Sequence, residues 1–427
     1  MIRLIEAYGY KCLKRIWTPL DNFQILVGPN ASGKSTFLDV VGLLGDLVQE
    51  GLDKAIKKRA QNFSDLAWLG KRRWFALVIE VELPERLKNL MKLKHFGREY
   101  VRFRYEVVIG KEATGKVQII DETLWLKPED PATLTPQGQE DFNQLNLFEN
   151  GTTLPKDYPH RQRTPPGWRK TVNKVSSSGK DYFISETTGW NAPFSLGPRK
   201  MALANVPAEE ERFPVSSWAR ELLMEGIDIL ALNSEAMRRP CSPLSPDTFE
   251  PDGSNLPIVI KKLKREDPKQ FKRWVKHLQT SLYDIQNVNV KERPEDKHLY
   301  IVITYTSGLK VPSWSISDGT LRMMALTLLA YLPEKERIFL VEEPENGIHP
   351  KAIETVFQSL SSAYDNQILV ATHSPVILSV AKPDQVLCFR KGAEGDSRII
   401  RGNQHPGLKG WRGKKNLGVL YASGVLD

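Results

Sequence analysis

A glycine-rich loop lies between a short apolar run and an apolar-periodic segment near the amino terminus. The apolar run covers residues 23–27, the loop has the spacing G-x-x-x-x-G-K-S, and the periodic segment covers residues 37–48. This order predicts a buried strand, a tight loop and a helix. Only glycine lets the backbone wrap closely around an anion, and a helix start carries partial positive charge. We therefore expect this loop to bind phosphate groups.

The last three residues of the loop each have an expected partner in a complex with a nucleoside triphosphate and Mg²⁺. The loop consists of Gly28, Pro29, Asn30, Ala31, Ser32, Gly33, Lys34, Ser35 and Thr36. We expect Lys34 to reach the β- and γ-phosphates, Ser35 to ligate Mg²⁺, and Thr36 to donate to the α-phosphate. A plain glycine turn before a helix is the alternative, and it explains less of the pattern. The loop predicts ATP and Mg²⁺ as ligands.

A second apolar run ends in a cluster of carboxylates. Residues 338–341 are all apolar and are followed by Glu342, Glu343, Pro344 and Glu345. Such a run is typical of a buried parallel strand, and an open α/β sheet binds its ligands at the carboxyl ends of the strands. We expect Glu342 to hold Mg²⁺ and Glu343 to activate the water that attacks the γ-phosphate. An acidic helix cap after a core strand is the alternative.

A third apolar run, residues 367–371, is followed two residues later by His373. A lone histidine is usually structural, but this strand end is predicted to lie at the same sheet edge as the carboxylates. There a neutral imidazole could contact the γ-phosphate or hold the attacking water. The residues alone leave these two roles open.

A hydroxyl-rich helix start precedes the acidic strand. Ser317, Asp318 and Gly319 open a predicted helix that runs to residue 332, and a helix start of this kind can bind an anion. One nucleotide does not need two anion sites. A head-to-tail pair of subunits explains both, because each helix start would cover the γ-phosphate held by the partner's loop. An ordinary helix N-cap is the alternative.

The composition is that of a globular chain. Its 427 residues carry 60 Lys and Arg against 51 Asp and Glu, a net charge of +9 that permits a nucleic-acid partner without requiring one. The three cysteines are far apart and lack metal-ligand spacing, which favours a reducing cytosol. No apolar run approaches the ~20 residues needed to cross a bilayer, and the first ten residues resemble a strand more than a signal sequence. We expect a cytoplasmic protein without a membrane partner.

The remaining patterns predict a mixed α/β architecture. Strands are expected at 1–10, 17–27, 74–83, 100–109, 117–127, 171–175, 181–185, 299–305 and 309–314, the third to fifth of them as an antiparallel meander. Residues 128–214 are otherwise expected to be an irregular lobe tip. One helix is expected with Ser217 as its N-cap and an apolar stripe formed by Leu222, Leu223, Ile227 and Leu230. Another helix is expected over residues 268–282. We expect an amino-terminal lobe (1–127), an inserted irregular and helical lobe (128–297) and a carboxyl-terminal lobe (298–427).

The order of the motifs resembles one family. G-P-N-A-S-G-K-S, S-D-G-T-L-R, L-V-E-E-P-E-N-G-I-H-P and A-T-H-S-P occur in this order in the ABC-type ATPases of the RecF, SMC and OLD group. Residues 232–240, 253–257 and 417–426 also resemble its compact AAA-family members without a coiled coil. The resemblance implies an ABC-type P-loop ATPase head with an antiparallel β lobe. It also implies a homodimer that sandwiches ATP and acts as a switch or clamp. We expect this homodimer or a higher homo-oligomer built of such dimers.

The chain departs from that family in four places. Glu342 stands where most of the wider group has Asp, and Ser317-Asp318-Gly319 replaces Ser-Gly-Gly, which argues against an ordinary transporter subunit. The glutamine that the family has in the loop after the first helix has no clear counterpart in this chain, and Gln61 is the nearest candidate. Only 54 residues follow His373, without an acidic strand-end cluster, so we expect no TOPRIM nuclease domain in this chain.

Three functional hypotheses follow. The first is an ATPase switch that controls a separately encoded effector, such as a TOPRIM-like or other nuclease, in bacterial defence. The second is a RecF-like clamp on DNA, supported by a basic run within residues 258–276. That run contains Lys261, Lys262, Lys264, Arg265, Lys269, Lys272, Arg273 and Lys276. A solvated helix face explains the run equally well. The third is a transport or structural module, for which no membrane-coupling signal is present.

Overall fold

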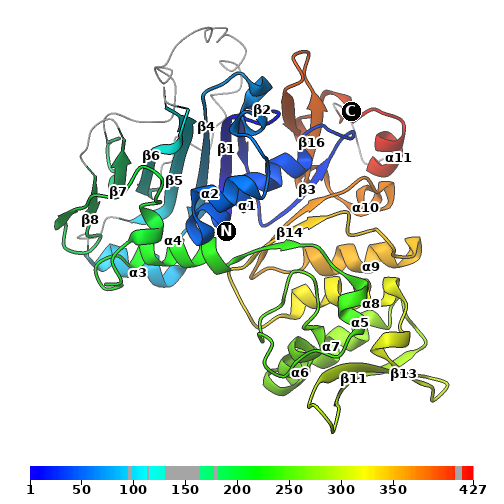
Figure 1. Cartoon of the computed structure of the whole chain (residues 1–427). Coiled ribbons are helices and arrows are strands. Elements are labelled where there is room, and N and C mark those ends of the chain that lie inside the picture. Colours follow the sequence, from blue (N-terminus) through cyan, green and yellow to red (C-terminus); the bar gives the residue numbers. More distant parts are fainter. Residues whose placement is uncertain (95–98, 113–114, 130–163, 177–180, 409–415, 427) are drawn as a thin grey trace. The chain divides into compact units, whose positions relative to one another are not determined.

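The computed structural model describes residues 1–94, 99–112, 115–129, 164–176, 181–408 and 416–426. The chain forms two compact units (Figure 1). The first unit comprises Met1, Leu20–Leu38 and Gly226–Asp427, and the second comprises Ile2–Pro19 and Asp39–Glu225. Each unit is therefore assembled from segments that are far apart in the sequence. The expected three-part division into 1–127, 128–297 and 298–427 stays a prediction.

The first unit contains a six-stranded sheet with the order β10-β14-β15-β3-β16-β17. Its strands are β3 (Phe23–Val27), β10 (Ile227–Leu230), β14 (Ile338–Glu342), β15 (Gln367–Ala371), β16 (Val386–Lys391) and β17 (Ser397–Arg401). All neighbours are parallel except β16 and β17. The apolar runs predicted as buried parallel strands, β14 and β15, lie side by side, and β3 pairs with β15 on one side and β16 on the other in the interior of the sheet.

Helices and a small antiparallel sheet complete the first unit. The helices are α1 (Lys34–Glu50, whose second half belongs to the other unit), α5 (Ser234–Arg238), α6 (Leu256–Glu266), α7 (Pro268–Leu278), α8 (Asp318–Leu328), α9 (Pro350–Ser361), α10 (Pro375–Val380) and α11 (Leu417–Ala422). The three-stranded sheet has β11 (Ile285–Glu292), β12 (Leu299–Tyr305) and β13 (Lys310–Pro312). One apolar cluster joins these elements, and within it Trp274 donates its indole N–H to Thr327 at 3.0 Å.

The second unit is built on an eight-stranded antiparallel sheet with the order β2-β1-β4-β5-β6-β7-β8-β9. Its strands are β1 (Ile2–Tyr10), β2 (Leu13–Pro19), β4 (Trp74–Glu82), β5 (Tyr100–Lys111), β6 (Val117–Pro128), β7 (Arg169–Val175), β8 (Tyr182–Ile184) and β9 (Asn191–Pro193). Its helices are α2 (Leu52–Lys57), α3 (Glu85–Lys94) and α4 (Pro214–Glu225). The predicted meander is β4-β5-β6, and the predicted α/β class with an antiparallel β lobe is confirmed.

Two expectations about residues 128–230 are wrong, the irregular lobe tip and the helix from Ser217. The expected strands at 171–175 and 181–185 are present as β7 and β8, but together with β9 they extend the antiparallel sheet and do not form a lobe tip; residues 130–163 lie outside the described residues. Ser217 is not an N-cap, because α4 begins at Pro214 and Glu186 accepts from the backbone of Val215 and Ser216 instead. The predicted helical stripe also breaks, since residues 227–230 pair with β14 as the parallel strand β10.

A network of buried charges crosses the antiparallel sheet of the second unit. Arg104 on β5 donates to Glu6 on β1 at 2.7 Å and 3.0 Å, to Glu80 on β4 at 3.1 Å and to Glu106 on its own strand. Lys127 on β6 donates to both carboxylate oxygens of Glu80 at 3.0 Å. All five side chains are buried, so each charge depends on its partners rather than on water.

Candidate functional site

The glycine loop leaves the carboxyl end of β3 and enters α1, as predicted. Gly28 has φ of 145°, and a Cβ atom there would lie 2.1 Å from the backbone oxygen of Phe389 on β16. The residue must therefore be glycine, because any side chain would collide with a neighbouring strand. Gly33 also has positive φ, 104°, just before the first residue of α1. The loop backbone is thus folded tightly around the start of the helix.

Lys34 and Ser32 direct polar atoms into this loop. Lys34 is buried, and its Nζ donates to the backbone oxygens of Gly28 at 2.8 Å and Pro29 at 3.0 Å. Ser32 is also buried, and its Oγ has no hydrogen-bond partner within the described part of the chain. Buried polar atoms are normally satisfied. The unsatisfied hydroxyl of Ser32 and the ammonium of Lys34 therefore give this loop two donors that an anion can engage.

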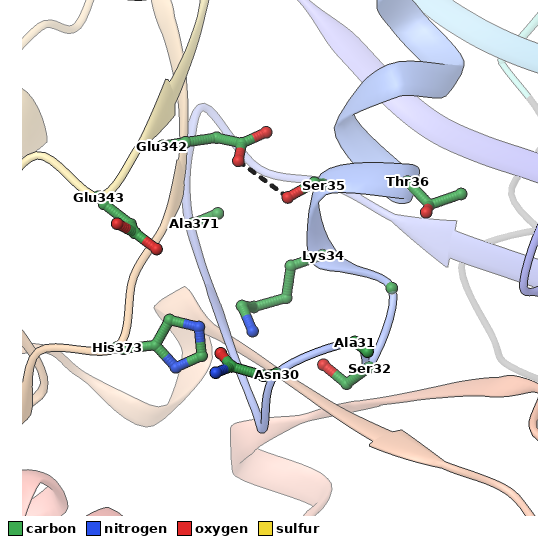
Figure 2. Close-up of a pocket in the computed structure, with 11 residues that line it drawn as sticks. Asn30, Ala31, Ser32, Lys34, Ser35, Thr36, Glu342, Glu343, Ala371 and His373 are labelled. Atoms are coloured by element: carbon green, nitrogen blue, oxygen red, sulfur yellow. Dashed lines mark hydrogen bonds between the residues drawn. The ribbon is translucent and has the colours of Figure 1, made fainter. Parts of the chain in front are cut away.

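Two oxygen ligands meet where β14 ends and α1 begins. Ser35 donates from Oγ to Oε2 of Glu342 at 2.8 Å, and Figure 2 shows the two side chains pointing at each other. Hydroxyl and carboxylate oxygens suit Mg²⁺, which is usually bound through one or two carboxylates together with substrate phosphates and water. Among the described residues no group of three or more His, Cys, Asp and Glu forms a metal cage. The pair fits an ion that is shared with a phosphate ligand.

Glu343 occupies a strained backbone position at the end of β14. Its φ is 47°, a left-handed value that non-glycine residues rarely adopt. Its backbone N–H donates to the oxygen of Ala371 at 2.8 Å, and its side chain accepts from the amide of Asn346. These contacts hold the strained turn, which sends the Glu343 carboxylate toward the same cavity as Lys34 (Figure 2).

Glu345 connects the turn after β14 to the turn after β15. Its Oε1 accepts from Thr372 Oγ1 at 2.7 Å and from the backbone N–H of His373 at 3.1 Å. The sequence analysis gave Glu345 no role, because nothing in the run E-E-P-E separates a carboxylate that binds a ligand from one that braces a loop. Glu345 fixes the backbone of His373, and the imidazole of His373 lines the cavity.

The predicted strand-end residues and most of the predicted loop residues line one cavity of about 190 Å³. Its lining residues are Asn30, Ala31, Ser32, Gly33, Lys34, Ser35, Thr36, Glu342, Glu343, Ala371 and His373. Gly28 and Pro29 do not line it, but their backbone oxygens hold Lys34. All of these residues belong to the first unit. The glycine loop therefore meets, at the carboxyl edge of one parallel sheet, two strand ends that lie some 300 residues further along the sequence.

The predicted second anion site lies elsewhere on the first unit. Ser317 accepts from the backbone N–H of Thr320 at 3.3 Å as the N-cap of α8, so the ordinary capping role is present. Ser317, Asp318 and Gly319 do not line the cavity, and the first two are exposed. Arg238 of α5 donates to the backbone oxygen of Ile316 and pairs with Asp318 at 2.6 Å.

Gly319 has a packing reason of its own. A Cβ atom there would lie 2.6 Å from the backbone oxygen of Gly347, in the loop that follows the acidic strand end. The Ser317 turn is therefore packed tightly against the loop that carries Glu343, while its hydroxyl stays open to solvent. Gln61, the candidate for the glutamine loop, belongs to the second unit and does not line the cavity.

None of the helices in the described ranges is long and apolar enough to cross a membrane. No curated protein sequence matches the chain. A family model does match, over residues 23–379, and its description is "AAA domain, putative AbiEii toxin, Type IV TA system". The matched region contains the glycine loop, the Ser317 turn, the acidic strand end and His373.

Solved structures of SMC head domains are similar over nearly their whole length. An SMC head bound to the C-winged helix domain of ScpA is 14% identical, with 93% of this chain and 96% of that chain covered and a TM-score of 0.48. An SMC head with an extended coiled coil bound to the ScpA C-terminal domain derived from Pyrococcus furiosus is 15% identical, covering 93% and 95%, with a TM-score of 0.44. The SMC head domain from Thermotoga maritima is 10% identical, covering 94% and 98%, with a TM-score of 0.39.

Proposed function

This chain belongs to the AbiEii-type AAA-domain family, and from that premise we propose that it binds ATP with Mg²⁺ and hydrolyses it to ADP and phosphate. One observation carries the proposal: Lys34, Glu343 and His373 follow three different strands and line a single cavity at the carboxyl edge of the parallel sheet. A cation, a strained carboxylate and an imidazole that line one cavity are typical of a catalytic site.

Each side chain has a chemical task in this proposal. Lys34 exchanges its bonds with the loop backbone for bonds with the β- and γ-phosphates. Ser35 and Glu342 hold Mg²⁺, which when bound neutralises charge on the phosphates. Glu343 accepts a proton from a water molecule as the water oxygen bonds to the γ-phosphorus. The bond from that phosphorus to the β–γ bridging oxygen breaks, and ADP and inorganic phosphate leave.

We propose that two copies grip ATP head to tail. The Ser317 turn is exposed, opens an 11-residue helix and does not line the cavity of its own chain. A second copy can therefore place this turn over the γ-phosphate, where Ser317, Asp318 and Gly319 add hydroxyl and backbone donors. Arg238 contacts Ile316 and Asp318. These contacts fix the Ser317 turn in the conformation that binding to the partner's nucleotide needs.

We further propose that this ATP-dependent dimer is a switch for a separately encoded effector, such as a nuclease, in bacterial defence. The support is the family description, which refers to a toxin and a type IV toxin–antitoxin system. The test is to co-express the chain with the product of the neighbouring gene and to purify it with ATP or with ADP. Capture that depends on ATP, and that Lys34→Ala abolishes, is expected; capture that is equal with ATP, with ADP and with Lys34→Ala would contradict the switch.

The hydrolysis proposal is tested on the purified chain. We expect phosphate release that requires Mg²⁺ and ATP, and we expect Lys34→Ala to abolish binding of a fluorescent ATP analogue because the loop loses its only side-chain cation. Lys54→Ala, which removes an exposed ammonium from α2, is the matched control and should leave binding unchanged. A wild-type chain that binds no nucleotide would favour a transport or structural module instead.

A RecF-like DNA clamp is the second candidate, favoured by the exposed basic side of α6 and α7. Lys269, Lys272, Arg273 and Lys276 are all exposed, whereas Lys262 is paired with Glu334 at 2.8 Å. If this side binds DNA, affinity should fall steeply with salt, and reversing Lys269, Lys272 and Lys276 to Glu should abolish it. Reversal of Lys54 and Lys57 on α2 is the control. Absence of salt-dependent binding by the wild-type chain would exclude this candidate.

A further inference from the structure

The carboxyl-terminal helix α11 is packed against the helix that follows His373. Gly418 is the contact point: a Cβ atom there would lie 2.1 Å from the backbone oxygen of Pro375, the first residue of α10. Asn416 caps α11 by accepting from the N–H of Gly418 at 2.7 Å. Both helices belong to the first unit. The glycine allows a backbone approach that fixes the position of α11 relative to the His373 turn.

One side chain of α11 reaches both the glycine loop and the histidine. The hydroxyl of Tyr421 donates to the backbone oxygen of Gly28 at 3.3 Å and lies 3.2 Å from Nδ1 of His373. Gly28 also accepts from Lys34 at 2.8 Å, and a carbonyl oxygen has two lone pairs for two donors. Tyr421 thus joins the start of the phosphate-binding loop to the imidazole that lines the cavity.

The direction of these bonds determines which ring nitrogen of His373 carries a proton. A backbone oxygen can only accept, so the single hydroxyl proton of Tyr421 is used toward Gly28. The bond to His373 then requires the imidazole to donate from Nδ1–H to the tyrosine oxygen. A neutral imidazole with its proton on Nδ1 has a lone pair on Nε2, the ring nitrogen that remains for a ligand in the cavity.

We propose that Tyr421 is a positioning residue that holds His373 in the Nδ1–H form, so that Nε2 accepts a hydrogen bond from the attacking water. This inference rests on the proposed ATP hydrolysis. It separates the two roles that the residues alone left open, because a neutral imidazole of this form cannot donate from Nε2 to the γ-phosphate. Tyr421 touches no reacting atom itself and acts on hydrolysis through His373.

Tyr421→Phe tests the proposal, since it removes the hydroxyl and keeps the ring. We expect kcat for ATP hydrolysis to fall about three- to tenfold, the effect of one lost neutral hydrogen bond, with KM for ATP nearly unchanged. In a His373→Ala background the same substitution should have no further effect on kcat, because the residue through which it acts is gone. Val419→Ala, on the exposed side of α11, is the matched control and should match the wild type.

Gly418→Ala provides a second variant that leaves the hydroxyl in place. The added methyl group should displace α11 from α10 and lower kcat in the same way as Tyr421→Phe, again without effect in the His373→Ala background. Wild-type hydrolysis with no change in Tyr421→Phe, or an equal loss with and without His373, would overturn the proposal and leave the proposed function intact. A wild-type chain that binds ATP without hydrolysing it would instead contradict the proposed function itself.

Discussion

The two large sheets of this protein both carry carboxylates, but they use them differently. In the parallel sheet, Glu342 and Glu343 follow an apolar strand and face a cavity. In the antiparallel sheet, Glu6, Glu80 and Glu106 lie in the middle of strands and are enclosed by their partners. A carboxylate at the end of a strand is available for chemistry, whereas a carboxylate within a strand holds the sheet together. Position along the strand separates these two roles, and burial or charge alone does not.

The pKa values of the enclosed carboxylates reflect both their burial and their basic partners. Burial works against the charged form of Glu80, yet Arg104 and Lys127 hold the pKa of its carboxyl below the usual value. Burial raises the pKa of Glu106 above its usual value even though Arg104 donates to it. One guanidinium therefore contacts carboxylates whose pKa values are shifted in opposite directions. Such a network is a structural device, because any change to one member alters the others.

Glu343→Gln, at the end of a strand of the parallel sheet, should give the largest effect, on the rate of ATP hydrolysis. We expect the rate of ATP hydrolysis to fall on the order of 10²–10⁴-fold, because the amide cannot accept the proton of the attacking water. Binding of ATP should persist, and the protein should remain dimeric with ATP bound when measured by light scattering. Its unfolding midpoint should match the wild type, since the carboxylate is exposed.

The matched substitution on the other sheet is Glu106→Gln, which removes a carboxylate of the same size from the middle of β5. It should change stability and leave the rate of hydrolysis per folded molecule close to that of the wild type. If Glu343→Gln hydrolyses ATP normally while Glu106→Gln does not, the roles assigned to the two sheets are reversed.

Arg104→Ala should give the next largest effect, on stability. The substitution leaves three buried carboxylates without their shared cation, which typically costs about 3–5 kcal/mol. Chemical denaturation followed by tryptophan fluorescence should show a lower midpoint for the unfolding of the second unit. Arg86→Ala, on the exposed side of α3, is the control. An unchanged midpoint for Arg104→Ala would remove the structural role from this network.

A smaller effect comes from Glu186, a third kind of carboxylate that caps α4. Burial raises its pKa from 4.5 to about 7, although Ser216 and the backbone of Val215 and Ser216 donate to it. Between these two values the folded state keeps a proton that the unfolded state has lost, so stability falls as the pH rises from about 4.5 to 7.

The decline should amount to about 3–4 kcal/mol at most, since the pKa rises from 4.5 to about 7 and one pKa unit corresponds to about 1.4 kcal/mol. Glu186→Gln cannot titrate and should flatten this part of the pH dependence of unfolding, measured at pH 5 and pH 7.5. If the variant and the wild type lose the same stability between those two pH values, Glu186 is not the source.

Much of the candidate site was predictable because its parts are local. A glycine loop between strand and helix, and apolar strands that end in Glu342 or His373, each carry their own pattern. The AAA-family membership predicted from the order of these motifs is confirmed. Tyr421 and Glu345 were missed because their roles depend on contacts with residues that are distant in the sequence, which no periodicity reveals.

The fold was less predictable where local preference and tertiary pairing disagree. Residues 227–230 continue the apolar spacing of a helix, but Gly226 ends α4 and the following residues pair with β14. Strand β11 was missed because it is polar along much of its length and is held by pairing with β12. In both cases the partner strand decides the conformation, and that partner lies elsewhere in the chain.

The central claim, that two copies share each nucleotide, is tested most directly by mixing two inactive variants. Lys34→Ala lacks the phosphate-binding lysine, and Ser317→Arg blocks the exposed turn that would cover the partner's nucleotide. In a one-to-one mixture half of the dimers contain one of each, and each of these has one complete site, so about a quarter of the wild-type hydrolysis rate should return. A mixture that stays as inactive as its components would contradict a site built from two subunits.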